Sequence, residues 1–339
     1  MYSPARDRAQ ERINALKMGF RFTERQARFL LTVLQHSGVF MGRHYAAFAG
    51  ITHGQKVHDF LERLLATRFA TAFRVGRAGR TRIFHVHYKP LYAAIGEPEN
   101  RNRKPIAIGR AIERMMVLDA VLVEREFVWL GTELDKYAHF VMLLQGRLQN
   151  DELPRLVFRK DARDQTVRYF PDKLPIGVDP ETESHVFLFL AAAGSPMDFR
   201  QFLLRHAELL RAVRSWTIRV LLPRERASLR DTYEAAVYDQ LGHPMPLSYR
   251  DDLFASFQRR RDGQPPGRIG LDLPTPGVRI PSAPARTALY RRWLEVGNTV
   301  VTQVTSSSLR DALQSGRGTV ECVILPHAYA HLSSLAGTS

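Results

Sequence analysis

The residues of this chain best suited to recognition chemistry are polar side chains at the start of one amphipathic segment, 55–66. They are His53, Gln55, Lys56 and Asp59, followed about two turns later by Arg63. Imidazole, amide, ammonium and carboxylate groups hydrogen-bond to base edges in the grooves of DNA. A recognition helix reads bases mainly with its N-terminal residues. We therefore predict base contacts from the first four residues and a further DNA contact from Arg63.

Arginines dominate the stretch that follows. Two strand-like runs, 69–75 and 81–88, are joined by a segment with glycines at 76 and 79, which permit the tight turn of a hairpin. The basic side chains of this hairpin are Arg74, Arg77, Arg80 and Arg82. Guanidinium groups bind phosphate oxygens and are attracted to a narrow minor groove. These four arginines are therefore predicted contacts to the DNA backbone.

Three predicted helices position these side chains. The first begins with a capping box formed by Thr23 and Gln26 and runs to about His36. A short second helix, 43–49, ends at a glycine-bounded turn, and the third helix covers 55–66. Three helices followed by a basic hairpin are typical of a winged helix-turn-helix, which we assign to residues 23–97, after an N-terminal arm at 1–22. A solvated charged surface and a protein-docking module are the alternatives for this pattern.

The composition favours an anionic partner. Of 339 residues, 49 are Lys or Arg and 34 are Asp or Glu, a formal net charge of +15. Nucleic acid is the commonest partner of so basic a protein. No long apolar run and no signal-peptide core is present, so no membrane partner is predicted. Cys322 is the only cysteine; it indicates a reducing cytoplasm, and its place in an apolar run predicts a core residue.

After a predicted linker at 98–107, the pattern changes to a mixed α/β region that we assign to residues 108–339. Helices are predicted at 108–124, 132–144, 198–213, 225–241, 249–261, 285–296 and 306–315. Strands are predicted at 156–158, 166–170, 186–191, 216–222, 299–304 and 319–325, with a long loop at 262–284. The strands on either side of helix 198–213 predict a right-handed parallel crossover. The predicted fold class is therefore α+β.

Pro171 and Asp172, behind an N-terminal winged helix, carry a family resemblance. Over residues 23–222 or so, the chain resembles the replication-relaxation family of bacterial plasmids and integrative elements. That family pairs a winged helix with a C-terminal domain similar to the PD-(D/E)xK restriction-endonuclease-like fold. The resemblance implies a DNA-binding protein of a mobile genetic element that acts in replication, transfer or control of transcription.

The resemblance also defines a test of nuclease chemistry. In that fold, the Asp after Pro and a D/E-x-K on the next strand hold a divalent metal beside the scissile phosphate. Asp172 matches the first acid, but the predicted strand 186–191 contains neither an acid nor a lysine, and Glu133 and Glu183 do not occupy the motif position. A single carboxylate binds such a metal weakly. We therefore predict an inactive nuclease-like domain, with Asp172 as a turn or capping residue and no catalytic residue, metal or cofactor.

Two other patterns are weaker. His85, His87 and Tyr88 resemble the histidine cluster and nucleophilic tyrosine of a relaxase, but they fall on the second strand of the predicted wing. No G-x-x-x-x-G-K-[ST], G-x-G-x-x-G or H-E-x-x-H motif is present. His44, His53 and His58 lack the spacing of zinc ligands, so we expect polar surface or hydrogen-bonded side chains.

These observations predict a sequence-specific, double-stranded DNA-binding regulator of transcription that forms a homodimer through its C-terminal domain. Dimers suit the paired half-sites that helix-turn-helix modules usually read. A metal-dependent DNA-processing enzyme of plasmid replication or mobilisation is one alternative. The other is an accessory protein that recruits a replication or transfer complex without reading sequence.

Overall fold

The computed structural model of the chain describes residues 4–75, 81–159, 165–191, 196–245, 247–264, 281–300 and 306–329. The chain divides into two compact units, and it passes between them more than once. The first unit comprises Met1–Thr132, Leu221–Ala227 and Ile324–Ser339, and the second comprises Glu133–Val220 and Ser228–Val323. Among the described residues, no helix is both long and apolar enough to cross a lipid bilayer.

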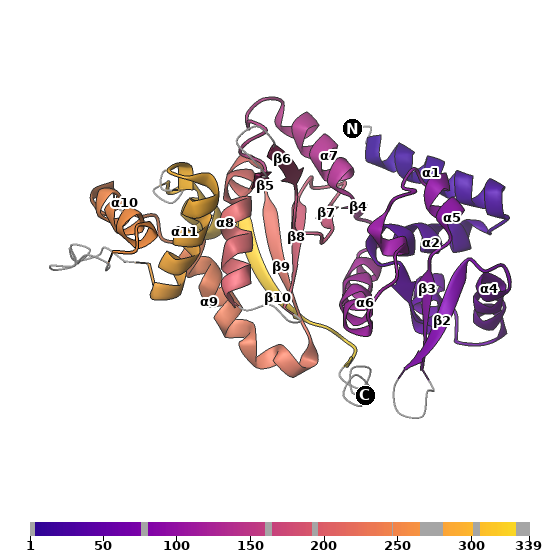
Figure 1. Cartoon of the computed structure of the whole chain (residues 1–339). Coiled ribbons are helices and arrows are strands. Elements are labelled where there is room, and N and C mark those ends of the chain that lie inside the picture. The colour runs from indigo at the N-terminus through magenta and orange to yellow at the C-terminus, as the bar shows by residue number, and fades with distance from the viewer. Residues whose placement is uncertain are drawn as a thin grey trace. The chain divides into compact units, whose positions relative to one another are not determined.

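The first unit contains helices and one small antiparallel sheet (Figure 1). Its helices are α1 (Pro4–Phe20), α2 (Glu24–His36), α3 (Gly42–Ala49), α4 (Gln55–Ala66), α5 (Lys89–Ala94), η2 (Arg101–Arg103) and α6 (Ile108–Val123). Its strands are β1 (Val39–Phe40), β2 (Ala70–Val75), β3 (Thr81–Val86) and β4 (Val128–Leu130). The sheet has the order β1-β3-β2, and β2 pairs with β3 from Ala70 opposite Val86 to Val75 opposite Thr81. The predicted helices 23–36, 43–49 and 55–66 and both hairpin strands are confirmed.

The capping box at the start of α2 is also confirmed. The backbone N–H of Gln26 donates to the Thr23 hydroxyl at 3.3 Å, and the backbone N–H of Thr23 donates to the Gln26 side chain at 3.1 Å. Both bonds satisfy amides that the first turn of a helix leaves without a partner. The helix then buries Phe29, Leu30 and Leu34 in the core of this unit.

The segments predicted as an arm and a linker are packed parts of the first unit. Helix α1 contributes Ile13 and Leu16 to the core. Within 98–107, the Asn102 side chain is buried and donates to the backbone carbonyls of Leu34 and Gln35. The boundary between the two units falls after Thr132, beyond the predicted linker, because α6 also packs on this core through Leu118.

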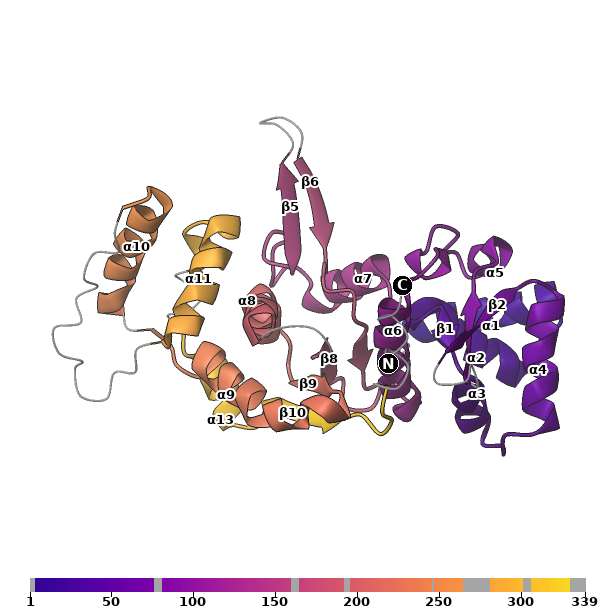
Figure 2. The ribbon, with the colours of Figure 1, turned by 60° about the horizontal axis from the view of Figure 1, so that its bottom comes forward.

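The remaining elements lie wholly or mainly in the second unit, apart from the short η3, which spans a boundary between the units (Figure 2). The helices are α7 (Glu133–Leu144), α8 (Pro196–Ala212), η3 (Arg224–Leu229), α9 (Arg230–Leu241), α10 (Leu247–Arg261), α11 (Ala283–Val296) and α13 (Ser308–Gln314). The strands are β5 (Arg155–Arg159), β6 (Gln165–Tyr169), β7 (Ile176–Val178), β8 (His185–Leu190), β9 (Trp216–Leu222) and β10 (Gly318–Ile324). Strands β10, β9, β8 and β7 are neighbours in that order, with β7 antiparallel to β8, and β5 and β6 form a separate hairpin.

Helix α8 packs on the sheet of the second unit through aromatic residues. The ring of Phe189 on β8 lies 4.8 Å from Phe199 and 5.5 Å from Phe202, measured between ring centroids. Cys322 on β10 is buried, and burial raises the pKa of its thiol to about 11. It is therefore a core residue, as predicted. With helices and strands in both units, the chain is an α+β protein.

Two predictions in the C-terminal region need comment. The predicted strand 299–304 is wrong at Thr299 and Val300, which are helical, because burial of Val300 among α10 and α11 outweighs its β propensity. The rest of that segment, 301–304, and positions 265–280 of the predicted loop 262–284 lie outside the described residues.

Candidate nucleic-acid interface

Helix α4 has one buried and one exposed face. Val57, Phe60 and Leu64 are buried in the core of the first unit. The residues predicted to read bases lie on the other side: His53, Gln55, Lys56 and Asp59 are all exposed. The amphipathic spacing that defined the helix therefore also presents these four side chains to solvent together, at its N-terminal end.

The connection between α3 and α4 depends on two glycines. Gly50 ends α3 in the left-handed region, with φ of 63°, a conformation that costs a side-chain-bearing residue about 1 kcal/mol or more. Gly42 allows a close approach, because a Cβ there would lie only 2.8 Å from Nε2 of His53 and 3.2 Å from Leu61. The imidazole of His53 is therefore placed against the first turn of α3.

Gln55 and Asp59 form a pair one turn apart. Nε2 of Gln55 donates to Oδ1 of Asp59 at 2.6 Å. An amide nitrogen carries two hydrogens, so one N–H and the carbonyl oxygen of Gln55 stay available beyond that bond. Asp59 thus orients the Gln55 amide at the exposed end of α4.

Two arginines predicted as DNA contacts have partners within the protein. Nη2 of Arg63 donates to the carbonyl oxygens of Phe20 and Arg21 at 2.8 and 3.1 Å, and its guanidinium lies over the Phe22 ring. Nη1 of Arg82 lies 3.0 Å from Oε1 of Glu62 on α4. Arg63 therefore links α4 to the end of α1 by hydrogen bonds, and Arg82 links the hairpin to α4 by an ion pair. Sequence periodicity gives no sign of either partner.

Arg74 is more exposed than Arg82, although the two face each other across the hairpin. They are direct partners in the β2–β3 register, so their side chains lie on the same face as Ala70, Phe84 and Val86 of the core. Arg74 is exposed at the far end of that face, on the α4 side of the hairpin. Arg77 and Arg80 lie outside the described residues.

A buried polar cluster supports α3, and sequence reasoning missed it. Asp119 of α6 accepts from Nη1 and Nη2 of Arg43 at 3.1 and 3.2 Å, and its Oδ1 lies 2.9 Å from Nε2 of His44. The hydroxyl of Tyr329 donates to the same carboxylate and accepts from Arg43. The only sequence signal is an acid within the apolar run 115–123.

The protonation of this cluster follows from its contacts. Burial opposes ionisation of Asp119, but its hydrogen bonds with His44 and Tyr329 and the positive charge of Arg43 outweigh burial and lower the pKa to about 2. Nδ1 of His44 accepts from the backbone N–H of Met41 at 2.8 Å, so the neutral ring carries its proton on Nε2, toward Asp119. His44 is therefore a hydrogen-bonded side chain, one of the two outcomes expected for it.

Asp172, the acid of the nuclease comparison, is held by an arginine. Nη1 of Arg205 on α8 lies 2.8 and 2.7 Å from the two carboxylate oxygens. Buried Lys136 of α7 donates to the backbone carbonyls of Asp172 and Leu174. Asp172 lies in a bend, in line with the turn that was one of its two predicted roles, and it also forms an ion pair that was not predicted, because α8 brings Arg205 to it across 33 residues of sequence.

Three histidines lie close to this ion pair or to one another in the second unit. Nε2 of His139 and Nε2 of His185 are 2.9 Å apart, and His206 lies 3.9 Å from Asp172. Burial lowers the pKa of His185 to about 3 and that of His206 to about 4, so both rings are neutral near pH 7. Within the described ranges, no group of three or more His, Cys, Asp or Glu residues is placed to hold a metal ion.

His85 and Tyr88 of the relaxase-like pattern pack within the first unit. Nε2 of His85, which is buried, lies 3.0 Å from the carbonyl oxygen of Asn102. The ring of Tyr88 stacks on Phe69, with 4.9 Å between centroids. The histidine and the tyrosine therefore have separate packing partners.

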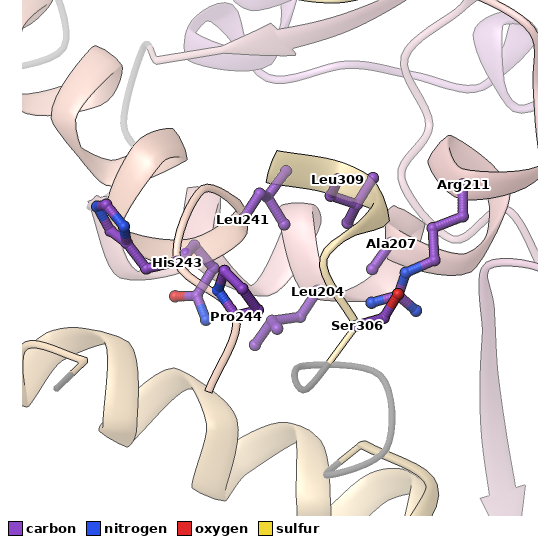
Figure 3. Close-up of a pocket in the computed structure, with 9 residues that line it drawn as sticks. Leu204, Ala207, Arg211, Leu241, His243, Pro244, Ser306 and Leu309 are labelled. Carbon is purple, nitrogen blue, oxygen red and sulfur yellow. The ribbon is translucent and has the colours of Figure 1, made fainter. Parts of the chain in front are cut away.

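A small pocket in the second unit is shown in Figure 3, with Arg211, His243 and Ser306 among the side chains that line it. Its cavity volume is about 10 Å³, roughly enough for one water molecule. A ligand-sized pocket measures about 300 Å³ or more. The cavity is therefore far smaller than a ligand-sized pocket.

Comparison of the chain with protein-family models, curated proteins and solved structures found no match. The exposed end of α4 brings imidazole, amide, ammonium and carboxylate groups together at the start of one helix.

Proposed function

We propose that residues 23–97 form a winged helix-turn-helix and that the protein is a sequence-specific, double-stranded DNA-binding regulator. The observation that carries the proposal is the exposed N-terminal face of α4, where His53, Gln55, Lys56 and Asp59 stand together. The order α2-β1-α3-α4-β2-β3, with a β1-β3-β2 sheet, supports it. In this arrangement α4 is the recognition helix, which enters the major groove by its N-terminal end.

The pair formed by Gln55 and Asp59 suggests which base is read. Adenine offers an N7 acceptor and an N6 donor in the major groove, and a glutamine amide matches both. Because Asp59 takes one hydrogen of the Gln55 amide, the remaining N–H and the carbonyl oxygen form the donor and acceptor that adenine requires. Lys56, which only donates, suits the O6 and N7 acceptors of guanine.

Electrostatic attraction to the phosphate backbone adds to the binding free energy from the base contacts. The formal net charge of +15 favours contact with the phosphate backbone, and Arg74 is exposed on the α4 side of the hairpin. We assign Arg74 to phosphate contact, and we propose that Arg63 and Arg82 position α4. A homodimer that places two α4 helices on paired half-sites completes the proposal.

The first test is selection of bound fragments from genomic DNA and from a random-sequence pool at physiological salt. We expect one enriched palindromic motif with an adenine in each half-site. Gln55→Ala then relaxes the preference at that adenine by about 1–3 kcal/mol, which is the discrimination given by one bidentate base contact. Lys56→Ala relaxes it at a guanine.

The matched comparison uses Arg74→Ala and Arg110→Ala. Arg74→Ala weakens binding to every sequence alike and lowers the salt slope of log K by about 0.9, the value for one phosphate. Arg110 is an exposed arginine on α6, paired with Glu113, and its removal leaves motif and slope unchanged. If Gln55→Ala and Lys56→Ala lose the same affinity on selected and scrambled DNA, α4 does not read sequence.

A further inference from the structure

We infer that the second unit carries its own phosphate-binding surface for double-stranded DNA, made by arginines stacked on the aromatic residues of α10 and α11. This arginine patch comprises Arg260 and Arg261, at the end of α10, with Tyr290 and Trp293 of α11 beneath them. It goes beyond the proposed function, because it uses none of the α4 residues and does not require that α4 reads sequence.

The two helices form a rigid support for this patch. Helices α10 and α11 lie side by side in Figures 1 and 2. They share a core in which Leu253 and Phe257 of α10 pack with Leu289 and Trp293 of α11. The indole of Trp293 also donates to Oδ1 of Asn298 at 3.3 Å. The aromatic rings under the arginines are therefore fixed by packing.

The stacking fixes the two guanidinium groups while leaving them in solvent. Cζ of Arg260 lies 4.2 Å from the Tyr290 ring centroid, and Cζ of Arg261 lies 5.6 Å from that of Trp293. Both arginines are exposed. A stacked guanidinium keeps its N–H edges free to donate, and its side chain loses less conformational entropy when a phosphate binds.

Among the described residues, Arg260 and Arg261 differ in their acidic neighbours. Arg261 lies 3.1 Å from Asp262. For Arg260, no carboxylate of the described residues lies within ion-pair distance. A third arginine, Arg259, precedes the pair in the last turn of α10, so the helix ends in three consecutive positive charges.

The chemistry favours phosphodiester groups over the other anionic surfaces. Neither α10 nor α11 contains a lysine, and arginine is the side chain that recognises phosphate bidentately. A membrane-binding helix would place a wide apolar face beside its cations, whereas Leu253 and Phe257 of α10 are buried in the core shared with α11, and Phe254 is partly buried against it. A nucleic-acid backbone, with its regularly spaced phosphates, fits consecutive arginines best.

The test measures binding of the full chain to a labelled duplex of scrambled sequence across a range of salt concentrations. We expect Arg260→Ala to lower the slope of log K against log salt by about 0.9. The affinity ratio between about 50 and 200 mM salt then falls about 3.5-fold relative to the unaltered chain. Arg260→Lys keeps the charge and gives a smaller loss.

The matched control is Arg250→Ala in the first turn of the same helix, where Arg250 is paired with Asp251 at 3.0 Å. It removes one positive charge and leaves the slope unchanged. A slope for Arg260→Ala equal to that of the unaltered chain overturns the inference. Loss of binding to phosphatidylserine vesicles without loss on DNA also overturns it and assigns the patch to a membrane surface.

The same measurements on a duplex that carries the selected motif, with Lys56→Ala, Arg260→Ala and the double variant, separate this inference from the proposed function. If the two substitutions weaken binding additively, both surfaces contact DNA. If only Arg260→Ala has an effect, the assignment of α4 fails and the arginine patch stands. If only Lys56→Ala has an effect, the arginine patch is wrong and the α4 interface stands.

Discussion

Asp119→Asn should strongly destabilise the first unit. The carboxylate of Asp119 is buried, and it contacts Arg43, His44 and Tyr329. Asparagine has the same shape but no charge, and its amide hydrogens point at groups that are themselves donors. The substitution therefore removes a buried ion pair and leaves the donors at one of the two former carboxylate oxygens without an acceptor.

The magnitude follows from the burial of each partner. Breaking a buried ion pair by removing one member costs about 3–5 kcal/mol. The Arg43 side chain is 29% exposed and can recover part of its hydration, which places the expected cost at about 3 kcal/mol. In a unit of this size, that loss lowers the melting temperature by about 6–12 °C.

The assay combines urea denaturation, followed by circular dichroism, with hydrogen exchange of peptides from α3 and α6. Tyr329→Phe is the matched variant; it removes a single hydroxyl and should cost about 1 kcal/mol. Because the two residues share one cluster, the double variant should lose less than the sum of the single losses.

The pH dependence gives an independent check. The folded-state pKa of Asp119, about 2, lies below its unfolded value of 3.8. Its stabilisation is therefore fully present above about pH 4 and is lost as the pH falls toward 2. The difference between Asp119→Asn and the unaltered chain should shrink over that interval. A cost below about 1 kcal/mol at pH 7, or one that does not change with pH, refutes this account of the cluster.

Two further predictions concern the buried histidines and the first helix of the predicted winged helix. The pKa values of His185 and His206 lie below the unfolded value of 6.5 because of burial. Below that pH the unfolded chain binds more protons than the folded chain. The free energy of unfolding of the second unit should therefore fall by up to about 2.7 kcal/mol for each unit by which the pH is lowered from 6 to 4. Calorimetric titration should show that His206→Gln halves this slope; an unchanged slope would contradict the assignment. Thr23→Ala should cost about 1 kcal/mol in urea denaturation by removing the cap of α2, whereas Thr32→Ala, at an exposed hydroxyl within the same helix, should cost less.

Amphipathic spacing was enough to predict the helices that carry the candidate interface. α4 occupies 55–66 as predicted, because Val57, Phe60 and Leu64 recur at the period of one helical face. The two-residue strand β1 and the three-residue strand β7 were missed, since so few residues show no period.

Partners distant in sequence could not be predicted. Arg63 and Arg82 are of the residue type that commonly contacts DNA. The guanidinium of Arg63, however, is hydrogen-bonded to the end of α1, and that of Arg82 forms an ion pair with Glu62. The acceptors of Arg63 are backbone carbonyls, which every residue has, so no residue type marks them. The polar cluster around Asp119 depends on Tyr329, and no local pattern joins positions so far apart.

The discontinuous first unit has a consequence for synthesis of the protein on the ribosome. Asp119 and Tyr329 are 210 residues apart, and translation adds about 5–20 residues per second. Helices α3 and α6 therefore emerge roughly 10–40 s before the tyrosine that completes their cluster. During that interval the carboxylate of Asp119 lacks one of its donors, so the nascent first unit reaches its full stability only after the second unit has been made.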